Sequence, residues 1–274
     1  MLILKAERKL NLSNRERRKY YQQLAIKRLG ETRINNNGSK MWIVDYKNAT
    51  DITVRFENGY ICKTRYGEFI RGKVSNPYDR TVYNIGYLGE GKYKTYNNEK
   101  VTPQYQTWKD MLKRCYSIKE IEKYPTYKKC SVCEEWHNFQ NFAKWYDENY
   151  YEIECQRMCL DKDILCKGNT IYAPETCVFV PNNINTLFIN CKSKRGSLPI
   201  GITYDKKNNN YQAKCSMGNG KSKHLGKFTS VEDAFNCYKK NKELIIKEIA
   251  NQYKNLIPQK VYEAMMNYVV ELDD

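Results

Sequence analysis

Strict alternation between two kinds of side chain marks a short stretch near the carboxyl end of the chain, residues 211–216. One set of alternate positions is small or largely apolar and the other is polar or cationic: Tyr211, Ala213 and Cys215 against Gln212, Lys214 and Ser216. Because successive side chains of a β-strand point to opposite faces, the first set can pack inside while the second faces solvent. The stretch therefore predicts a sheet with one buried face and one polar, basic face.

The neighbouring segments complete a small domain around this strand. Residues 198–228 predict three short strands, in the last of which Leu225 faces inward and both Ser222 and His224 face outward. Residues 230–250 then show helical spacing, with Ala234, Tyr238, Leu244 and Ile245 as the expected inward positions. We predict a three-stranded sheet backed by one helix.

Positive charge is concentrated in two places. The 274 residues include 47 Lys and Arg against 31 Asp and Glu, a net charge of +16. Residues 8–28 carry eight basic residues and one acid, and residues 192–227 carry nine basic residues and one acid. Two concentrated basic segments indicate two surfaces for a polyanion. Nucleic acid fits better than a membrane surface, because neither segment has a strong apolar face and no apolar run approaches the roughly 20 residues of a spanning helix.

The carboxyl-terminal segment resembles the plant ethylene-response-factor (Apetala-type) DNA-binding domain. The resemblance covers about 55 residues and is carried by Gly201-Ile202, Tyr211–Lys214, His224–Phe228, Ser230–Ala234 and Tyr238. It implies DNA contacts at Thr203, Lys214, Ser216, Ser222 and His224, to which the polar face of the predicted sheet adds Gln212 and the first hairpin adds Lys206 and Lys207. The family often has arginines and a tryptophan at several of these positions, so its sequence preference does not transfer. The alternative is a solvated β-sheet domain with no such role.

Residues 160–185 resemble the second half of an HNH (ββα-metal) homing-endonuclease motif. The residues that carry it are Asp161-Lys162-Asp163, Gly168-Asn169, Pro174-Glu175-Thr176 and Asn185. The resemblance implies that Lys162 stands at the position of the catalytic histidine and Thr176 at that of the central asparagine, while Asn185 keeps the last polar position.

Lysine at that position changes the chemistry. The family's histidine is a general base and must be neutral near pH 7, whereas a lysine with a pKa near 10.4 is protonated there. We therefore expect a scaffold that holds DNA, with Lys162 contacting a phosphate, and that cuts poorly or not at all. The alternative is an active nuclease in which Asp161, Asp163 and Asn185 surround Mg²⁺, since carboxylates are ligands that this cation prefers.

A second metal hypothesis concerns zinc. Cys130-x-x-Cys133 with His137 resembles half of a zinc site, and Cys115 or Cys177 would complete four ligands. The alternative is a set of buried free thiols, which are common in protein cores. The eleven cysteines are an odd number and the chain shows no export signal, so we expect reduced thiols and a cytoplasmic protein.

The amino-terminal half predicts a helix followed by β structure. Ser13 with Glu16 forms a capping box for a helix over residues 13–29, which either lies on phosphates or is simply solvated. Residues 41–74 alternate as strands around an Asn58-Gly59 turn, and further short strands to about Lys100 would complete a small antiparallel barrel or sheet. Helices are expected from Thr102-Pro103 and up to about Asn149.

Together these patterns predict an α+β protein of several modules. Their boundaries are a basic N-terminal helix (1–37), a small β module (38–101), a degenerate HNH-like module (102–191), the DNA-binding sheet and helix (196–255) and a last helix (256–274). The expected function is sequence-selective binding of double-stranded DNA in a phage or mobile-element context, in the bacterial cytoplasm. Active homing endonuclease and binding of RNA or a host protein stay open as alternatives, and protein partners are not predicted.

Overall fold

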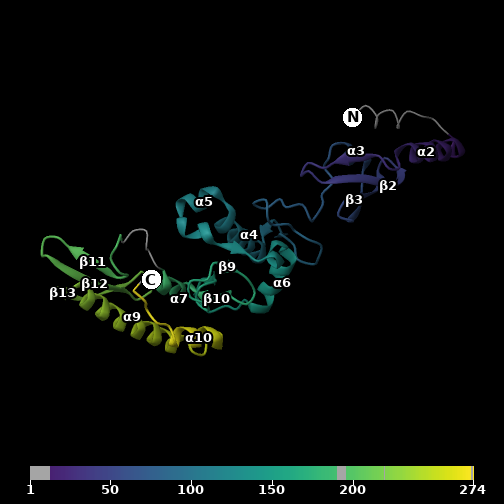
Figure 1. The fold of residues 1–274 in the computed structure, drawn as a ribbon. Coiled ribbons are helices and arrows are strands. Elements are labelled where there is room, and N and C mark those ends of the chain that lie inside the picture. The colour runs from purple at the N-terminus through teal and green to yellow at the C-terminus, as the bar shows by residue number, and fades with distance from the viewer. Residues whose placement is uncertain (1–12, 190–195, 219, 273) are drawn as a thin grey trace. The chain divides into compact units, whose positions relative to one another are not determined.

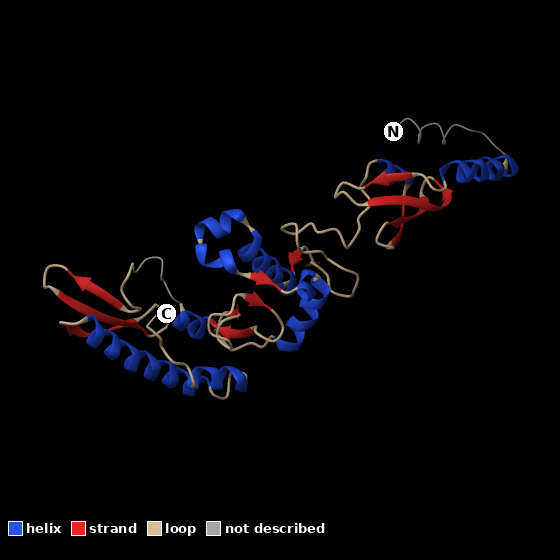
Figure 2. Cartoon of the chain, in the orientation of Figure 1, coloured by secondary structure: helices blue, strands red, loops and turns tan. Residues whose placement is uncertain are grey.

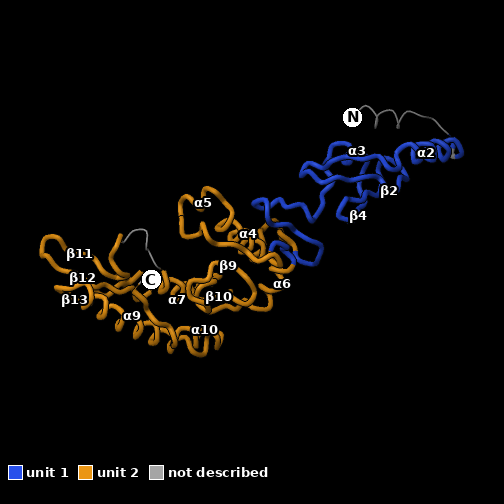
Figure 3. The backbone as a smooth tube through the Cα atoms, viewed as in Figure 1, with its two compact units in different colours: residues 1–93, 137–140 blue, residues 94–136, 141–274 orange. Residues whose placement is uncertain are grey.

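A computed structural model describes residues 13–189, 196–218, 220–272 and 274 of the chain. Helices alternate with mainly antiparallel strands, so the α+β class predicted from the sequence is confirmed (Figure 2). The chain divides into two compact units, unit 1 with residues 1–93 and 137–140, and unit 2 with residues 94–136 and 141–274 (Figure 3). Among the described helices, none combines the length and the apolar composition needed to cross a lipid bilayer.

Unit 1 begins with a capped helix that leads into a four-stranded sheet. The Ser13 hydroxyl oxygen accepts a hydrogen bond from the backbone N–H of Glu16, and the Glu16 carboxylate accepts one from the backbone N–H of Ser13. These two bonds confirm the predicted capping box. The sheet is antiparallel in the order β1-β2-β3-β4, and its core holds Ile43, Val54 and Phe56. The elements of this unit are α2 (Asn14–Arg28), β1 (Thr32–Ile34), β2 (Lys40–Asn48), β3 (Asp51–Phe56), β4 (Ile61–Thr64) and α3 (Tyr66–Ile70).

The short strands expected up to Lys100 are largely absent. Between α3 and residue 93 the described backbone forms turns and two isolated bridges, one of them Val82 with Gly86. Side chains organise this segment instead: the carboxylate of Asp79 accepts from Asn35 Nδ2 at 2.7 Å and from Asn37 Nδ2 at 3.1 Å. Hydrogen bonds from side chains replace the strand ladder that the sequence pattern predicted.

The first part of unit 2 is mainly helical. Thr102 caps α4, as predicted, and the buried Trp108 donates from Nε1 to the carbonyl oxygen of Trp136 at 2.7 Å. Trp136, Phe142 and Trp145 pack as an aromatic cluster. The elements here are β5 (Tyr96–Asn97), β6 (Lys100–Val101), α4 (Pro103–Tyr116), α5 (Ile118–Lys123), η1 (Pro125–Lys129), β7 (Ser131–Val132), η2 (Glu134–His137) and α6 (Phe139–Asn149), and η2 and α6 also include residues of unit 1.

A two-stranded antiparallel sheet and a short helix follow. Strand β8 (Met158–Asp161) pairs with β10 (Val178–Pro181), and the chain continues directly into α7 (Asn182–Asn185) and η3 (Thr186–Phe188). The loop between the two strands contains β9 (Ile171–Tyr172), which pairs with β7 in parallel. Asp161 therefore lies at the end of β8, opposite Val178.

The carboxyl-terminal part contains the predicted sheet and helix. Strands β11 (Ile202–Asp205), β12 (Asn210–Ser216) and β13 (Ser222–Phe228) pair in this order and are antiparallel, with α9 (Val231–Tyr253) running along one face and α10 (Gln259–Met266) after it (Figure 1). Ala234, Tyr238 and Ile245 are buried as expected, but the prediction for Leu244 is wrong, since its side chain is half exposed. Ile246 takes the inward position because the helix turns that face to the sheet.

One hydrophobic cluster joins this sheet and helix to the β8–β10 hairpin. Ile164, Val180 and Ile184 belong to the same cluster of buried residues as Ala213 and Ile246. Segments that the sequence analysis placed in separate modules thus share a core within unit 2.

Candidate nucleic-acid interface

The sheet of β11, β12 and β13 presents one polar face to solvent, which we call the outer face. Its cross-strand pairs are Thr203 with Gln212, Lys214 with His224 and Ser216 with Ser222, to which Lys227 is added opposite Gln212. Every one of these side chains is exposed except that of Gln212, which is half-buried. The alternation predicted from the sequence is therefore confirmed, and the side chains expected to contact DNA share one face.

The opposite face is buried against α9. Ile202, Ala213 and Cys215 are buried there. Gly201 lies just before β11 and has a φ of +77°, in the left-handed region, and a Cβ built on it would come within 2.2 Å of the Tyr238 ring. Only glycine permits both this backbone conformation and this close approach of helix and sheet.

A bulge in β13 sets which of its side chains face outward. Ala213 pairs with Gly226, whereas the next residue of β12, Lys214, pairs with His224, so Leu225 is an extra residue. Gly226 takes φ of +147° beside it. Such an insertion reverses the alternation along a strand. Lys227 and His224 consequently share the outer face. Lys227 is an outer-face cation that the sequence did not predict, because regular alternation from His224 would place Lys227 on the opposite face and the sequence gives no sign of the bulge.

The β11–β12 turn adds two exposed cations and one acid. Lys206 and Lys207 are exposed, and in the described part of the chain neither forms an ion pair. The carboxylate of Asp205 accepts from the side chain of Asn208 at 2.8 Å and from Gln212 Nε2 at 2.8 Å. These hydrogen bonds, that of Asn208 foremost, lower the pKa of Asp205. The acid is thus held in the turn, and Gln212 is engaged with it.

Lys162 lies in a different environment from the outer-face lysines. Its side chain is 9% exposed, and Nζ donates to the carbonyl oxygen of Asn169 at 2.8 Å and to the carboxylate of Asp163. Burial opposes its charge, but the hydrogen bond and the negative charge of Asp163 outweigh burial and raise the pKa of Lys162. This amine is therefore protonated near pH 7 and has no capacity to act as a general base.

The carboxylates beside Lys162 are also engaged. Asp161 Oδ1 accepts from the backbone N–H of Asp163 at 2.8 Å and of Ile164 at 2.7 Å, which closes the turn after β8. Burial is the largest influence on this carboxyl and raises the pKa of Asp161. Asn185 ends α7, half-buried, and among the described residues no hydrogen bond links it to Asp161, Lys162 or Asp163.

Cys130, Cys133 and His137 do not form a ready zinc site in the structure. Among the described residues, no three His, Cys, Asp or Glu side chains are grouped so as to hold a metal ion. That finding covers the set of Cys130, Cys133 and His137 but not Asp161 and Asp163 with Asn185, because it concerns groups of three His, Cys, Asp or Glu side chains. Burial raises the pKa of the Cys130 and Cys133 thiols, and all ten cysteines that the structure describes are free.

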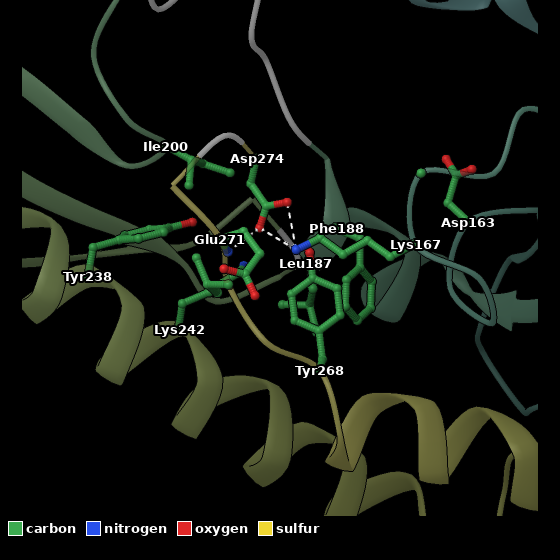
Figure 4. Close-up of a pocket in the computed structure, with 12 residues that line it drawn as sticks. Asp163, Lys167, Leu187, Phe188, Ile200, Tyr238, Lys242, Tyr268, Glu271 and Asp274 are labelled. Carbon is green, nitrogen blue, oxygen red and sulfur yellow. Dashed lines mark hydrogen bonds and ion pairs between the residues drawn. The ribbon is translucent and has the colours of Figure 1, made fainter.

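A cavity of about 520 Å³ lies next to this segment, between the β8–β10 loop, α9 and the last residues of the chain (Figure 4). Lys167 reaches across from the loop to the carboxylate of Asp274 at 2.7 Å and to the carbonyl oxygen of Val269 at 2.9 Å. Lys242 of α9 also lines the cavity, although it is 4% exposed, and its Nζ donates to the carbonyl oxygen of Ser216 at 3.3 Å. The cavity lies within unit 2, and the side chains that line it include both acidic and basic groups.

No model of a protein family matches the chain, and comparison with curated proteins and with solved structures finds no significant similarity to any of them.

Proposed function

We propose that the protein binds double-stranded DNA through the outer face of the β11–β13 sheet. The observation that carries the proposal is the segregation of the sheet: polar and cationic side chains are exposed on one face, and the other face is covered by α9. The cations of the outer face and its first turn lack ion-pair partners among the described residues, so they are available to phosphates.

The dimensions of the sheet support entry into a groove. Neighbouring strands lie about 4.8 Å apart, so three strands span about 10 Å between their axes. The major groove of B-DNA is about 12 Å wide and admits a two-stranded ribbon, so β12 can enter it together with one neighbouring strand. Central strand β12 would then lie deepest, with Lys214 and its partner His224 facing base edges. The lysines of the β11–β12 turn, Lys206 and Lys207, would contact phosphates and fix the register.

The β8–β10 hairpin with α7 supports a narrower role. Two antiparallel strands followed by a short helix fit the strand–strand–helix order of an HNH-like module. A protonated lysine at the position of the general base removes the step that activates water. We therefore propose that this hairpin is a degenerate HNH-like module that holds DNA without hydrolysing it.

The test is a binding measurement on the full chain. Fluorescence anisotropy with random-sequence duplex DNA at several salt concentrations gives both the affinity and its salt dependence, and selection of bound fragments gives the preferred sequence. Lys214→Gln should weaken binding about five- to fiftyfold on a selected site if it contacts base edges. Lys247→Gln is the matched control, because Lys247 is also exposed but lies on α9.

Three outcomes would overturn the proposal. They are the absence of duplex binding at low salt, equal effects of Lys214→Gln and Lys247→Gln, and a clear preference of the chain for RNA or for a protein over duplex DNA.

A further inference from the structure

Helix α2 carries a second concentration of exposed positive charge that the outer face does not account for. Arg15, Arg17, Arg18, Lys19 and Lys27 are all exposed. Glu16 is the only acid in the helix, and it is engaged in the capping box with Ser13. Among the described residues, none of these five cations forms an ion pair.

The carboxyl-terminal half of this helix is fixed to the sheet of unit 1. Arg28 is buried, with its guanidinium 3.8 Å from the centre of the Tyr66 ring and 4.9 Å from that of Tyr46. It also donates a hydrogen bond to the hydroxyl of Tyr46. Leu24 and Ala25 pack against the core of the sheet. Cation–π contacts are strongest for a desolvated cation, so this end of the helix is firmly held.

Three of these five cations lie on the side of the helix opposite Leu24 and Arg28. Arg15, Arg18 and Lys19 are spaced three and four residues apart, which places them on one face. At 3.6 residues per turn, that face lies about half a turn away from Leu24 and Arg28. Anchoring one side therefore presents the other side, with its three cations, to solvent. We call Arg15, Arg18 and Lys19 the cationic face of α2.

We infer that the cationic face of α2 is a second DNA-binding surface, which contacts the phosphate backbone of the duplex. The inference rests on the proposed function in one respect, namely that both surfaces engage one DNA molecule. Charge complementarity favours phosphates, and a helix with no ion pairs on its outward side loses no internal contacts on binding. A membrane is disfavoured, because Ile26 is the only large apolar side chain among the exposed residues of that side.

Two surfaces on one chain reinforce one another. Once one surface is bound, the other meets the same duplex at a high effective concentration. Because phosphate contacts carry no sequence information, the cationic face would strengthen binding equally on all sequences. The outer face of the sheet would retain the sequence preference.

The test compares two charge-matched triple variants of the full chain. Arg15→Gln, Arg18→Gln and Lys19→Gln together remove the cationic face. Lys40→Gln, Lys63→Gln and Lys73→Gln together remove three exposed cations from the sheet and the following loop of the same unit. Each lost phosphate contact lowers the slope of log affinity against log salt by about 0.9, so the first variant should lower it by about 2–3. Its effect should be the same on selected and random duplexes, and the second variant should leave the slope near that of the unchanged protein.

The outcomes separate this inference from the proposed function. If the cationic-face variant and its control have equal slopes while Lys214→Gln still weakens binding, the inference is overturned and the proposed function stands. If the cationic-face variant loses slope while Lys214→Gln and Lys247→Gln bind alike, the helix binds DNA and the proposal for the sheet is overturned. Circular dichroism of each variant checks that the fold is retained.

Discussion

The amide of Gln212 donates a 2.8 Å hydrogen bond to the carboxylate of Asp205, across the first turn of the carboxyl-terminal sheet. Both residues lie on the side of the sheet that we propose to face DNA. Asp205 is the only acid in the basic segment of residues 192–227. The bond ties a side chain suited to base recognition to a charge that repels phosphates. Asp205 therefore orders the turn, and we expect its charge to limit the affinity of this surface for DNA.

Replacing this acid should tighten DNA binding. Asp205→Asn keeps an oxygen for the backbone N–H groups of Lys207 and Asn208 but removes the negative charge. Removing one negative charge from the surface lessens its repulsion of phosphates, so affinity should rise about two- to fivefold at low salt. The pKa of Asp205 is lowered in the protein, so the carboxylate is ionised at pH 5.5 and at pH 8 and the gain should be equal at both.

The control for this variant is Glu248→Gln, which removes the same charge from the exposed side of α9. Equilibrium binding of both variants to one duplex gives the answer. Weaker binding by Asp205→Asn, with the turn intact by NMR, would show that the acid assists recognition.

The purified protein should not cleave DNA. Incubation of supercoiled plasmid with Mg²⁺ or Mn²⁺ should leave it intact, because Lys162 is protonated and Asp161 Oδ1 accepts two backbone hydrogen bonds. Agarose gels resolve nicked and linear products from the starting material. Cleavage that disappears in Asp161→Ala and in Asp163→Ala would contradict the proposal that the HNH-like module is degenerate. It would favour the alternative, an active nuclease in which these aspartates bind Mg²⁺.

Zinc should be absent from protein purified without chelators. Cys130, Cys133 and His137 are not part of any metal-binding group among the described residues, and burial raises the pKa of both thiols, which favours their protonated form. Elemental analysis by mass spectrometry measures the metal directly. A stoichiometric amount that is lost in Cys130→Ser would show that the ligands assemble around the ion.

The close approach of Gly201 to Tyr238 should make this glycine costly to replace. Gly201→Ala adds a Cβ 2.2 Å from the ring in a left-handed conformation, so we expect a loss of about 3 kcal/mol in the free energy of unfolding. Gly220→Ala is the matched control, since Gly220 has φ of +70° and nothing within 4 Å of the added atom. It should lose only about 1 kcal/mol. Urea unfolding followed by fluorescence compares them, and equal losses would contradict the predicted clash.

The buried Lys242 should leave a signature in the pH dependence of stability. Burial lowers the pKa of this amine below its ordinary value of 10.5, so the unfolded chain binds more protons between the two pKa values. Stability from this residue therefore rises with pH across that alkaline window and is constant below it. Lys242→Met should be neutral or stabilising by about 1 kcal/mol at pH 7, and the gain should shrink as pH approaches 10.5.

Lys247→Met, on the exposed side of the same helix, controls for the loss of charge. Thermal unfolding at pH 7, 9 and 10.5 measures the difference between the variants. A gain that grows with pH would contradict the depressed pKa.

Local signals predicted the parts of the fold that local chemistry determines. Ser13 with Glu16, and Thr102 before Pro103, form helix starts from neighbouring residues alone, and both are observed. The alternation in β12 likewise requires only that the strand have one buried face. These features were predictable because their partners lie within a few residues or on one covered face.

Features that depend on distant partners were not predictable. Leu244 is more apolar than Lys242, yet Leu244 is exposed and Lys242 is buried, because the sheet determines which side of α9 turns inward. One partner of Lys162 is the carbonyl oxygen of Asn169, a backbone group that no residue pattern reveals. The bulge at Leu225 depends on the pairing of β12 with β13, and it alone places Lys227 beside the predicted contacts.

The hydrophobic cluster that includes both Val180 and Ala213 has a mechanical consequence. A shared core prevents the β8–β10 hairpin from swinging freely on a linker while the β11–β13 sheet rests in a groove. If both the sheet and the hairpin contact DNA, as we propose, the hairpin would meet the double helix at a constant number of base pairs from the sheet. Unit 2 would then fix the spacing between its two DNA contacts. Footprints on unrelated DNA sites would show the same number of base pairs between the region protected by the sheet and the region protected by the hairpin.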